Sequence, residues 1–250
     1  EYDPEFNTTY ELGFKSVHLD GDLKLLGNVF YSDYEDMQRT LFGFVGYREL
    51  DGQAIYTLMT KNVPNSTIQG VELEFDWKPY EAGRLFGWVS LLDTENGGSS
   101  SSEATQDGYL CMERALVGVD PCNADGTIDL SGKNLTWSPE KSWNLQFEHN
   151  TYTSNGFRIM NIISANYTSE MFYNESNYAS EPFHSGRDDL YTVNTSMVFI
   201  DEANAWALEF YVHNATDELI KTDSYPANAG FVKAMYAPPM AYGVRFQKDF

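Results

Sequence analysis

The sequence has 250 residues, of which 42% are hydrophobic, 15% aromatic and 21% charged. This composition is typical of a folded protein and excludes disordered, collagen-like and coiled-coil chains. The 16 Lys and Arg residues against 37 Asp and Glu give a formal net charge of -21. Such a charge repels phosphates over most of the surface, so we expect no nucleic-acid partner.

Alternation of apolar and polar residues with a period of two predicts strands along the whole chain. In the second of them, Leu23, Leu25 and Val29 alternate with Lys24 and Asn28. No long amphipathic helix and no apolar run of about 18 residues is present, so the fold class is all-β and any membrane crossing would use strands. The predicted strands lie at about residues 10–15, 23–32, 71–77, 84–95, 143–148, 157–169, 191–199, 206–213 and 242–249.

The connections between these nine strands alternate strictly between short and long. The short ones, at 17–21, 79–83, 151–156 and 201–204, contain the Gly, Asn or Asp residues of tight turns. The long ones cover residues 36–60, 95–139, 169–188 and 220–240. Short turns at one end and long loops at the other are typical of an antiparallel transmembrane β-barrel in an outer membrane.

The two faces of the strands then predict two environments. The apolar face suits lipid, with Trp77, Trp143, Trp206 and Tyr242 near strand ends, where an aromatic girdle would lie. The opposite face is acidic and polar, which suits a wide, wet lumen. A soluble sandwich, with its apolar face in a core, would give the same alternation. The residues that we expect to face the lumen are Glu72, Glu74, Glu148, Arg158, Glu209 and Arg245.

Cys111 and Cys122 are the two cysteines, and they lie in one polar stretch. Because no His or CxxC motif accompanies them, we predict a disulfide in an oxidising compartment, with two unpaired surface thiols as the alternative. The four histidines are scattered, and no hydrolase, zinc-protease or phosphate-loop motif is present. We therefore expect no catalytic residue, no bound metal and no cofactor.

Five segments resemble the C-terminal part of TonB-dependent outer-membrane receptors, in the order that this family has them. They are YELGFKS at 10–16, FYSDYEDMQ at 30–38, QGVELE at 69–74, NATDE at 214–218 and YGVRFQKDF at 242–250. The last resembles the closing strand that the barrel assembly machinery reads, although Lys248 stands where an apolar residue is usual. That resemblance implies an assembly signal formed by Tyr242, Val244, Phe246 and Phe250.

The resemblance implies that residues 1–250 are the last nine strands of a barrel of twenty-two, and that the plug and the first strands are absent ahead of Glu1. Alone, such a piece would have two unpaired edges and should not give a stable monomer. The implied function is import of a scarce ligand across the outer membrane of a Gram-negative bacterium, with energy from TonB acting on the plug. The implied partners are outer-membrane lipid, the rest of the receptor and TonB; no enzymatic activity is implied.

Ligand capture falls to the long loops, because loops vary freely on a rigid scaffold. The resemblance implies a siderophore, cobalamin, a carbohydrate or a similar ligand, meaning a small molecule or an oligosaccharide. The candidate ligand-binding residues are Tyr109, Trp137, Phe172, Tyr173, Tyr178 and His184.

Two alternatives remain open. One is a passive porin without a plug. The other is a secreted, glycosylated β-sandwich, lectin-like or carbohydrate-active, because the chain is rich in Asn-X-Ser/Thr sequons. The sequons lie at Asn7, Asn65, Asn134, Asn166, Asn174, Asn194 and Asn214.

Overall fold

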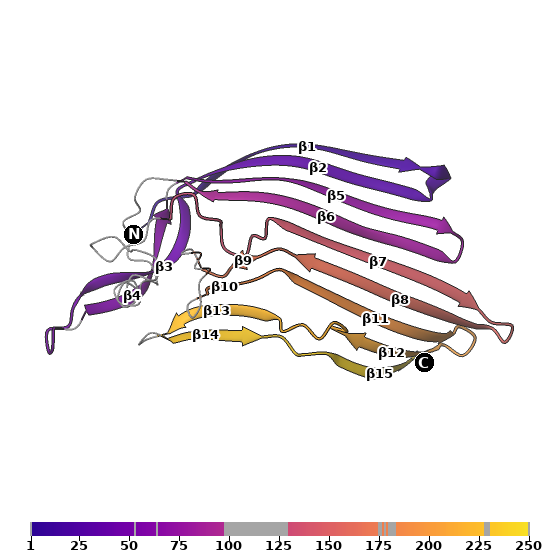
Figure 1. Cartoon of the computed structure of the whole chain (residues 1–250). Helices are drawn as coiled ribbons and strands as arrows, with labels where there is room; N and C mark the ends of the chain where they lie inside the picture. Colours follow the sequence, from indigo (N-terminus) through magenta and orange to yellow (C-terminus); the bar gives the residue numbers. More distant parts are fainter. Residues whose placement is uncertain are drawn as a thin grey trace.

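The computed structural model describes residues 2–52, 54–63, 65–97, 130–174, 177, 179, 184–227 and 231–249. Its main feature is one antiparallel sheet of nine strands, which lie side by side in chain order (Figure 1). This confirms the predicted all-β class. The strands are β1 (Phe6–His18), β2 (Leu23–Glu35), β5 (Ser66–Tyr80), β6 (Gly83–Asn96), β7 (Lys141–Tyr152), β8 (Phe157–Thr168), β11 (Leu190–Asp201), β12 (Trp206–His213) and β15 (Ala241–Lys248).

The tight turns lie at one end of this sheet and the long connections at the other (Figure 1). Between β1 and β2, the short 3-10 turn η1 (Leu19–Gly21) places Leu19 and Asp20 at φ values of 52° and 54° and Gly21 at 104°. Gly adopts this left-handed region without steric strain, and Asp tolerates it. The backbone amide of Asp22 donates to the carbonyl of Leu19 at 3.0 Å and closes the turn.

Three of the long connections contain two-stranded sheets that alternation did not predict. They pair β3 (Met37–Tyr47) with β4 (Ala54–Val63), β9 (Met171–Phe172) with β10 (Gly186–Arg187), and β13 (Lys221–Ala227) with β14 (Phe231–Tyr236). These pairs lie outside the nine-stranded sheet. Backbone groups still need partners there, and pairing into hairpins supplies them.

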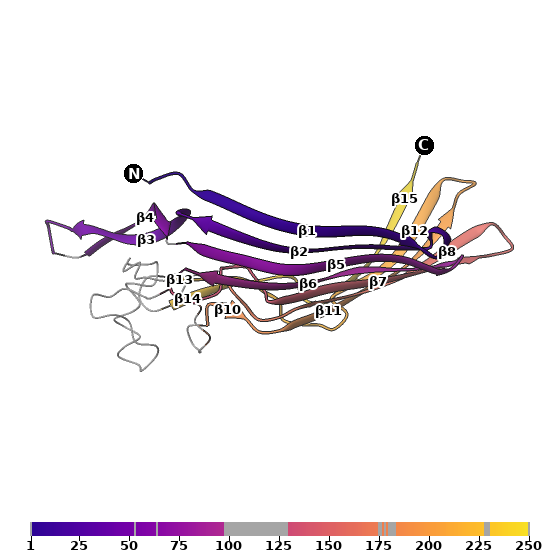
Figure 2. The same ribbon diagram turned by 90° about the horizontal axis from the view of Figure 1, so that it is seen from above.

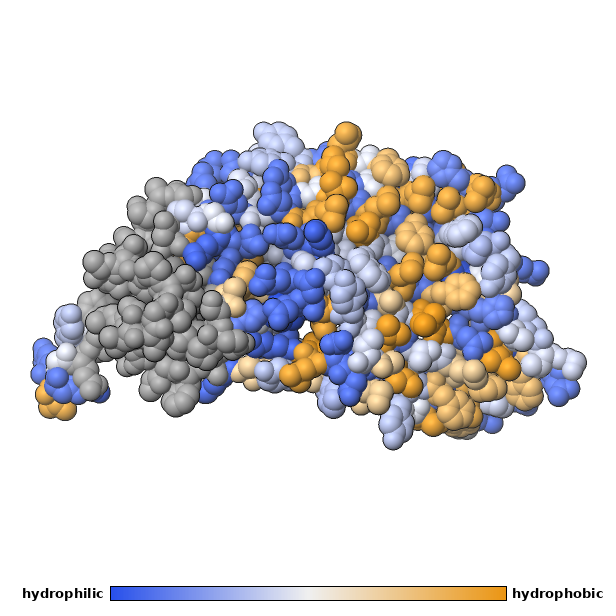
Figure 3. All heavy atoms as spheres, viewed as in Figure 1, coloured by the Kyte–Doolittle hydropathy of each residue, from blue (hydrophilic) through white to orange (hydrophobic). Residues whose placement is uncertain are grey.

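The register of the sheet gathers apolar side chains on one face from β1 to β15. Leu12 pairs with Val29, Val29 with Val71, and Val71 with Leu91, so four neighbouring strands put apolar side chains on one face. Further along, Met197 pairs with Phe210. Figure 3 shows hydrophobic side chains gathered over this face, most densely away from the long loops. We call it the apolar face.

Within the described residues, no part of the chain covers the apolar face. Leu12 is 75% exposed, Val244 60% and Phe246 63%. Among the described residues, the buried hydrophobic side chains are only Leu130, Leu135 and Tyr173. An apolar surface of this extent needs an apolar environment, because soluble monomers rarely expose patches above a few hundred Å². No helix in the described ranges is long and apolar enough to cross a membrane.

The sheet is curved across its strands, with β1 and β15 displaced to the same side of β7 and β11 (Figure 2). The apolar face, which Figure 3 shows, is the convex side of this trough. The register therefore places the polar side chains on the concave side. The two edge strands each have a partner on one side only, β2 and β12 respectively. The shape is that of part of a barrel wall.

Aromatic side chains form two rows on the apolar face. Toward the loop end, the ring of Tyr167 lies 6.0 Å from Trp143 and 4.5 Å from Tyr191. Toward the turn end, the ring of Trp206 lies 5.7 Å from Phe157 and 6.2 Å from Phe246. Tyr167 and Phe157 are ten residues apart on β8, which is about 34 Å along a strand. A tilt of about 45° reduces this to about 24 Å, close to the apolar band of about 25 Å in outer-membrane barrels.

Candidate functional site

The register places all six residues that were predicted to face a lumen on the polar face of the sheet. Arg84 pairs across strands with Glu148, and Glu209 pairs with Arg245. Glu72 and Glu74 follow on β5, and Arg158 on β8. Alternation places these residues on one face, because a change of one residue would move each side chain to the opposite face; that this face lines a lumen stays a prediction.

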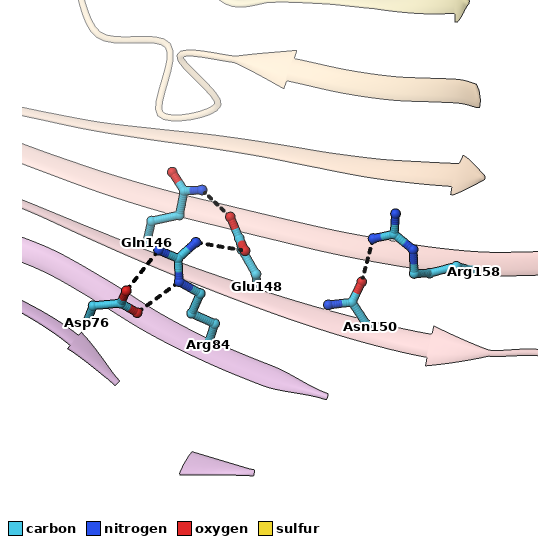
Figure 4. Close-up of polar contacts among 6 residues, drawn as sticks. All are labelled: Asp76, Arg84, Gln146, Glu148, Asn150 and Arg158. Carbon is cyan, nitrogen blue, oxygen red and sulfur yellow. Dashed lines mark hydrogen bonds and ion pairs between the residues drawn. The ribbon is translucent and has the colours of Figure 1, made fainter. Parts of the chain in front are cut away.

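One ionic network on this face joins three strands (Figure 4). The guanidinium of Arg84 on β6 donates to both carboxylate oxygens of Asp76 on β5, at 2.8 and 3.0 Å. Its Nη1 atom lies 3.8 Å from Glu148 on β7, which also accepts from Gln146 at 3.0 Å. The same guanidinium lies 4.4 Å from the ring centroid of Phe86. A bidentate contact of this kind fixes the orientation of the guanidinium relative to the carboxylate, in addition to pairing their charges.

Two more arginines are paired near the turn end. Arg245 donates to Glu209 at 2.8 Å, and Arg158 donates to Glu202 at 3.2 Å and to Asn150 at 3.3 Å. Figure 4 shows the contact between Arg158 and Asn150 beside the Arg84 network. The Glu202 side chain is 71% exposed, so water screens that pair strongly.

The long-loop end brings four of the predicted ligand-binding residues together. The rings of Trp137 and Tyr173 lie 4.7 Å apart, and those of Phe172 and His184 lie 6.4 Å apart. The amide of Trp137 donates to the carbonyl of Phe172 at 2.9 Å, and that of Tyr173 donates to Ser185 at 2.7 Å. Tyr173 and His184 are buried, whereas Trp137 is 52% exposed and therefore available to a ligand. We call Trp137, Phe172, Tyr173 and His184 the aromatic loop cluster.

Trp137 has a φ of 59°. For a bulky side chain this is an outlier that costs about 1–3 kcal/mol, and such strain gathers at functional sites. The hydrogen bond to Phe172 and the stacking on Tyr173 hold the residue in this conformation.

Two cations next to the cluster were not predicted from the sequence. The Nζ atom of Lys221 donates to the carbonyls of His184 and Gly186, at 3.0 and 2.9 Å, and Tyr173 donates to the carbonyl of Lys221. Arg187 donates to the hydroxyl of Thr168. Burial raises the pKa of the Tyr173 hydroxyl and lowers that of the Arg187 guanidinium. Lys221 lies 37 residues from His184, and no local pattern in the sequence reveals a contact at that separation.

Three potential metal ligands also meet at this end. One donor atom each of Glu170, His184 and Asp188 lies within 4.8 Å of the other two. Sequence reasoning treated the histidines as scattered and missed this cluster. The relevant signal was the pairing of β9 with β10, which alternation did not reveal.

The NATDE segment closes the connection after β12. Asn214 has a φ of 51°, and its backbone N–H donates to the side-chain oxygen of Asn194 at 2.9 Å. Its Oδ1 accepts from the amide of Glu218 at 3.0 Å, and its Nδ2 donates to the carbonyl of the same residue at 2.9 Å. Asp217 accepts from the amide of Met240 at 3.0 Å, just before β15. The motif therefore holds the path from β12 to β15.

The other predicted residues divide into two groups. Tyr242, Val244 and Phe246 lie on β15 and belong to the apolar face through their pairing with β12. The remaining predictions lie outside the described residues: the ligand contacts of Tyr109 and Tyr178, the terminal Phe250, and the disulfide between Cys111 and Cys122.

Residues 1–215 match the family model described as TonB dependent receptor-like, beta-barrel. The chain belongs to this family. The match confirms the predicted family and the predicted barrel architecture. The TonB-dependent receptors of this family are transport receptors of the outer membrane. A search of curated proteins found no match.

Solved receptors share the fold at low sequence identity. The ferric yersiniabactin uptake receptor FyuA from Yersinia pestis has a TM-score of 0.70 at 17% identity, over 98% of this chain and 30% of its own. The siderophore receptor PiuA from Acinetobacter baumannii has 0.64 at 14%, over 96% and 28%. The copper transporter OprC has 0.61 at 12%, over 99% and 32%. This TonB-dependent receptor chain thus spans about a third of the length of these structures.

Proposed function

We propose that this chain is the C-terminal barrel wall of a receptor that imports a scarce ligand across the outer membrane of a Gram-negative bacterium, with energy delivered by TonB to a plug domain. The observation that carries the proposal is the nine-stranded curved sheet, apolar on its convex face and polar on its concave face, with the long loops at one end. Lipid would cover the convex face, and the concave face would line the lumen.

In this proposal the six charged residues of the polar face line a wet lumen. Ionised groups there need no buried partner, because water solvates them. Glu72 and Glu74 then act as solvated wall residues, and the chain carries out no bond-making reaction. The rest of the receptor would complete the barrel beside β1 and β15 and supply the plug.

The aromatic loop cluster would contact the ligand at the extracellular end. An exposed indole held on a buried tyrosine gives a rigid platform, and Tyr and Trp give large contact area at low conformational entropy. FyuA and PiuA are named for ferric yersiniabactin and for siderophores, and OprC for copper. A siderophore is therefore the first ligand class to test, before cobalamin and carbohydrates.

Two further assignments belong to the same proposal. The barrel assembly machinery would read the closing strand through Tyr242, Val244, Phe246 and Phe250, which alternate as an apolar edge should. A disulfide between Cys111 and Cys122 would fasten the longest loop in the oxidising environment outside the inner membrane.

The test is an uptake assay in the source bacterium. Radiolabelled ferric siderophores, cobalamin and maltooligosaccharides are given separately to the wild type, to a strain lacking the receptor and to a strain lacking TonB. We expect uptake of one ligand class to be lost in both mutant strains. Uptake that depends on this protein but persists without TonB would support the passive porin instead.

The observed sheet does not support the alternative of a glycosylated β-sandwich. A sandwich needs two sheets packed face to face, with their apolar sides in contact. The described residues form one large sheet whose apolar side chains are exposed.

A further inference from the structure

We propose that Glu170, His184 and Asp188 form a binding site for one divalent transition-metal ion of the first row, such as Zn²⁺, at the loop end of the molecule. A donor atom from each residue lies within 4.8 Å of the other two. Glu170 lies directly ahead of β9, whereas His184 and Asp188 lie on either side of β10. The site does not depend on which ligand the receptor imports.

The backbone pairing places the two carboxylates opposite each other. Phe172 pairs with Gly186 and Met171 with Arg187. Continuing this antiparallel register by one step sets Glu170 across from Asp188. Like charges directly opposite each other are destabilising. Among the described residues, neither carboxylate forms an ion pair with a lysine or arginine. A bound cation would convert this repulsion into attraction.

The His184 side chain lies on the same side of the chain segment as the Asp188 side chain. Positions 184, 186 and 188 alternate along the chain, and the middle one is Gly186, which leaves no side chain between His184 and Asp188. A Cβ atom at Gly186 would lie 2.2 Å from the carbonyl oxygen of Met171, so the close approach of the two segments requires glycine.

His184 is held in place before any ion binds. Its side chain is 8% exposed and lies edge-on to Phe172, with ring centroids 6.4 Å apart. Its carbonyl accepts from Lys221 at 3.0 Å. The amide of Glu170 is fixed as well, because it donates to Asp189 at 2.9 Å. Fixed backbones with movable carboxylates let the ligands close around an ion without rebuilding the loop.

The donor set selects the class of ion. Calcium and magnesium take oxygen ligands, whereas imidazole suits zinc, copper, iron and nickel. Zinc bonds of about 2.0–2.2 Å to nitrogen and oxygen put donors about 3–4 Å apart. The exposed side chains of Glu170 and Asp188 can close the remaining distance by changing rotamer. Three protein ligands leave the other coordination positions to water.

The experiment uses the complete receptor, freed of metal with a chelator and titrated with Zn²⁺ by calorimetry. We expect Asp188→Asn and Glu170→Gln to remove one equivalent of binding or weaken it at least about tenfold. Glu140→Gln, which changes an exposed carboxylate at the same end of the sheet, should bind as the wild type does. Replacement of Zn²⁺ by Co²⁺ should give visible absorption bands that both ligand variants lose.

Two results would overturn the site. One is the same Zn²⁺ stoichiometry and affinity in the wild type and in both carboxylate variants. The other is a site that takes Ca²⁺ in preference to Zn²⁺, since that would show that His184 is not a ligand. The two exposed carboxylates carry the test because replacing the buried His184 can disturb the fold of the loop.

Discussion

Arg84 shows how a single side chain organises the polar face. Its two hydrogen bonds to Asp76 join β6 to β5, and its approach to Glu148 joins β6 to β7. The side chains of Arg84 and Asp76 are 41% and 29% exposed, so solvent screening limits the pair to about 1 kcal/mol or less. Its contribution is therefore direction: it keeps two carboxylates in fixed places on a wall that water reaches.

Trp137 is the residue whose proposed role in ligand capture is tested most simply. Trp137→Gly removes the indole and relieves the positive φ, whereas Trp137→Ala removes the indole and keeps the strain. We expect both variants to bind the imported ligand about two- to tenfold more weakly, because an aromatic contact contributes about 0.5–1.5 kcal/mol. Affinity is measured by calorimetry on the complete receptor.

The matched control is Tyr152→Ala, which removes an aromatic ring that is 71% exposed at the turn end of β7. This variant should bind the ligand like the wild type. Unchanged affinity in both Trp137 variants would remove the residue from the ligand site.

At the scale of elements, the nine strands of the large sheet were predictable because a sheet with one apolar face requires an apolar residue at nearly every second position. Leu23, Leu25 and Val29 display that rule in the sequence and lie on the apolar face in the structure. The ends of the strands were not predictable. Asn7 and Thr8 pair with β2 beyond the apolar band, where polar residues form the ladder equally well.

The contacts of the candidate site were not predictable either, because they do not depend on alternation. The sequence supplied the aromatic residues of the loops, but the β9–β10 pairing that sets Glu170 against Asp188 involves only two residues in each strand. Strands this short show no periodicity. The contact of Lys221 with His184 depends on how two loops fold together, and this cannot be inferred from either loop alone.

Ile162 and Ile163 on β8 provide a matched pair for testing the assignment of the two faces. Ile163 pairs with Phe147 and belongs to the apolar face, whereas Ile162 pairs with Glu148 and belongs to the polar face. Ile163→Arg should destabilise the receptor by about 2–4 kcal/mol, because it places a charge near the middle of the lipid band. Ile162→Arg should destabilise it much less.

The measurement for this pair is unfolding in guanidinium of the complete receptor reconstituted in lipid. Equal losses in the two variants, or a larger loss for Ile162→Arg, would show that the faces are assigned the wrong way round.

At the scale of the whole molecule, the curvature of the sheet brings its two edge strands toward the positions that a closed barrel requires. A sheet with exposed edges offers unpaired backbone groups, and a closed barrel removes them. β1 and β15 are such edges here, and the trough in Figure 2 curves in the direction that closure requires. The chain therefore has the geometry of part of a barrel wall.

In the proposed receptor, one face of this sheet contacts lipid and the other faces a water-filled lumen. The most direct test is nitroxide scanning of residues 158–165 on β8, in the complete receptor in lipid vesicles, with Cys111→Ser and Cys122→Ser as the background. Collisions with oxygen report exposure to lipid, and collisions with a water-soluble nickel chelate report exposure to water.

We expect two opposed patterns with a period of two. Oxygen accessibility should peak at positions 159, 161, 163 and 165, and nickel accessibility should be higher at 158, 160, 162 and 164. Accessibility to both probes without a period of two, or nickel accessibility that peaks at position 163, would contradict a wall between lipid and lumen.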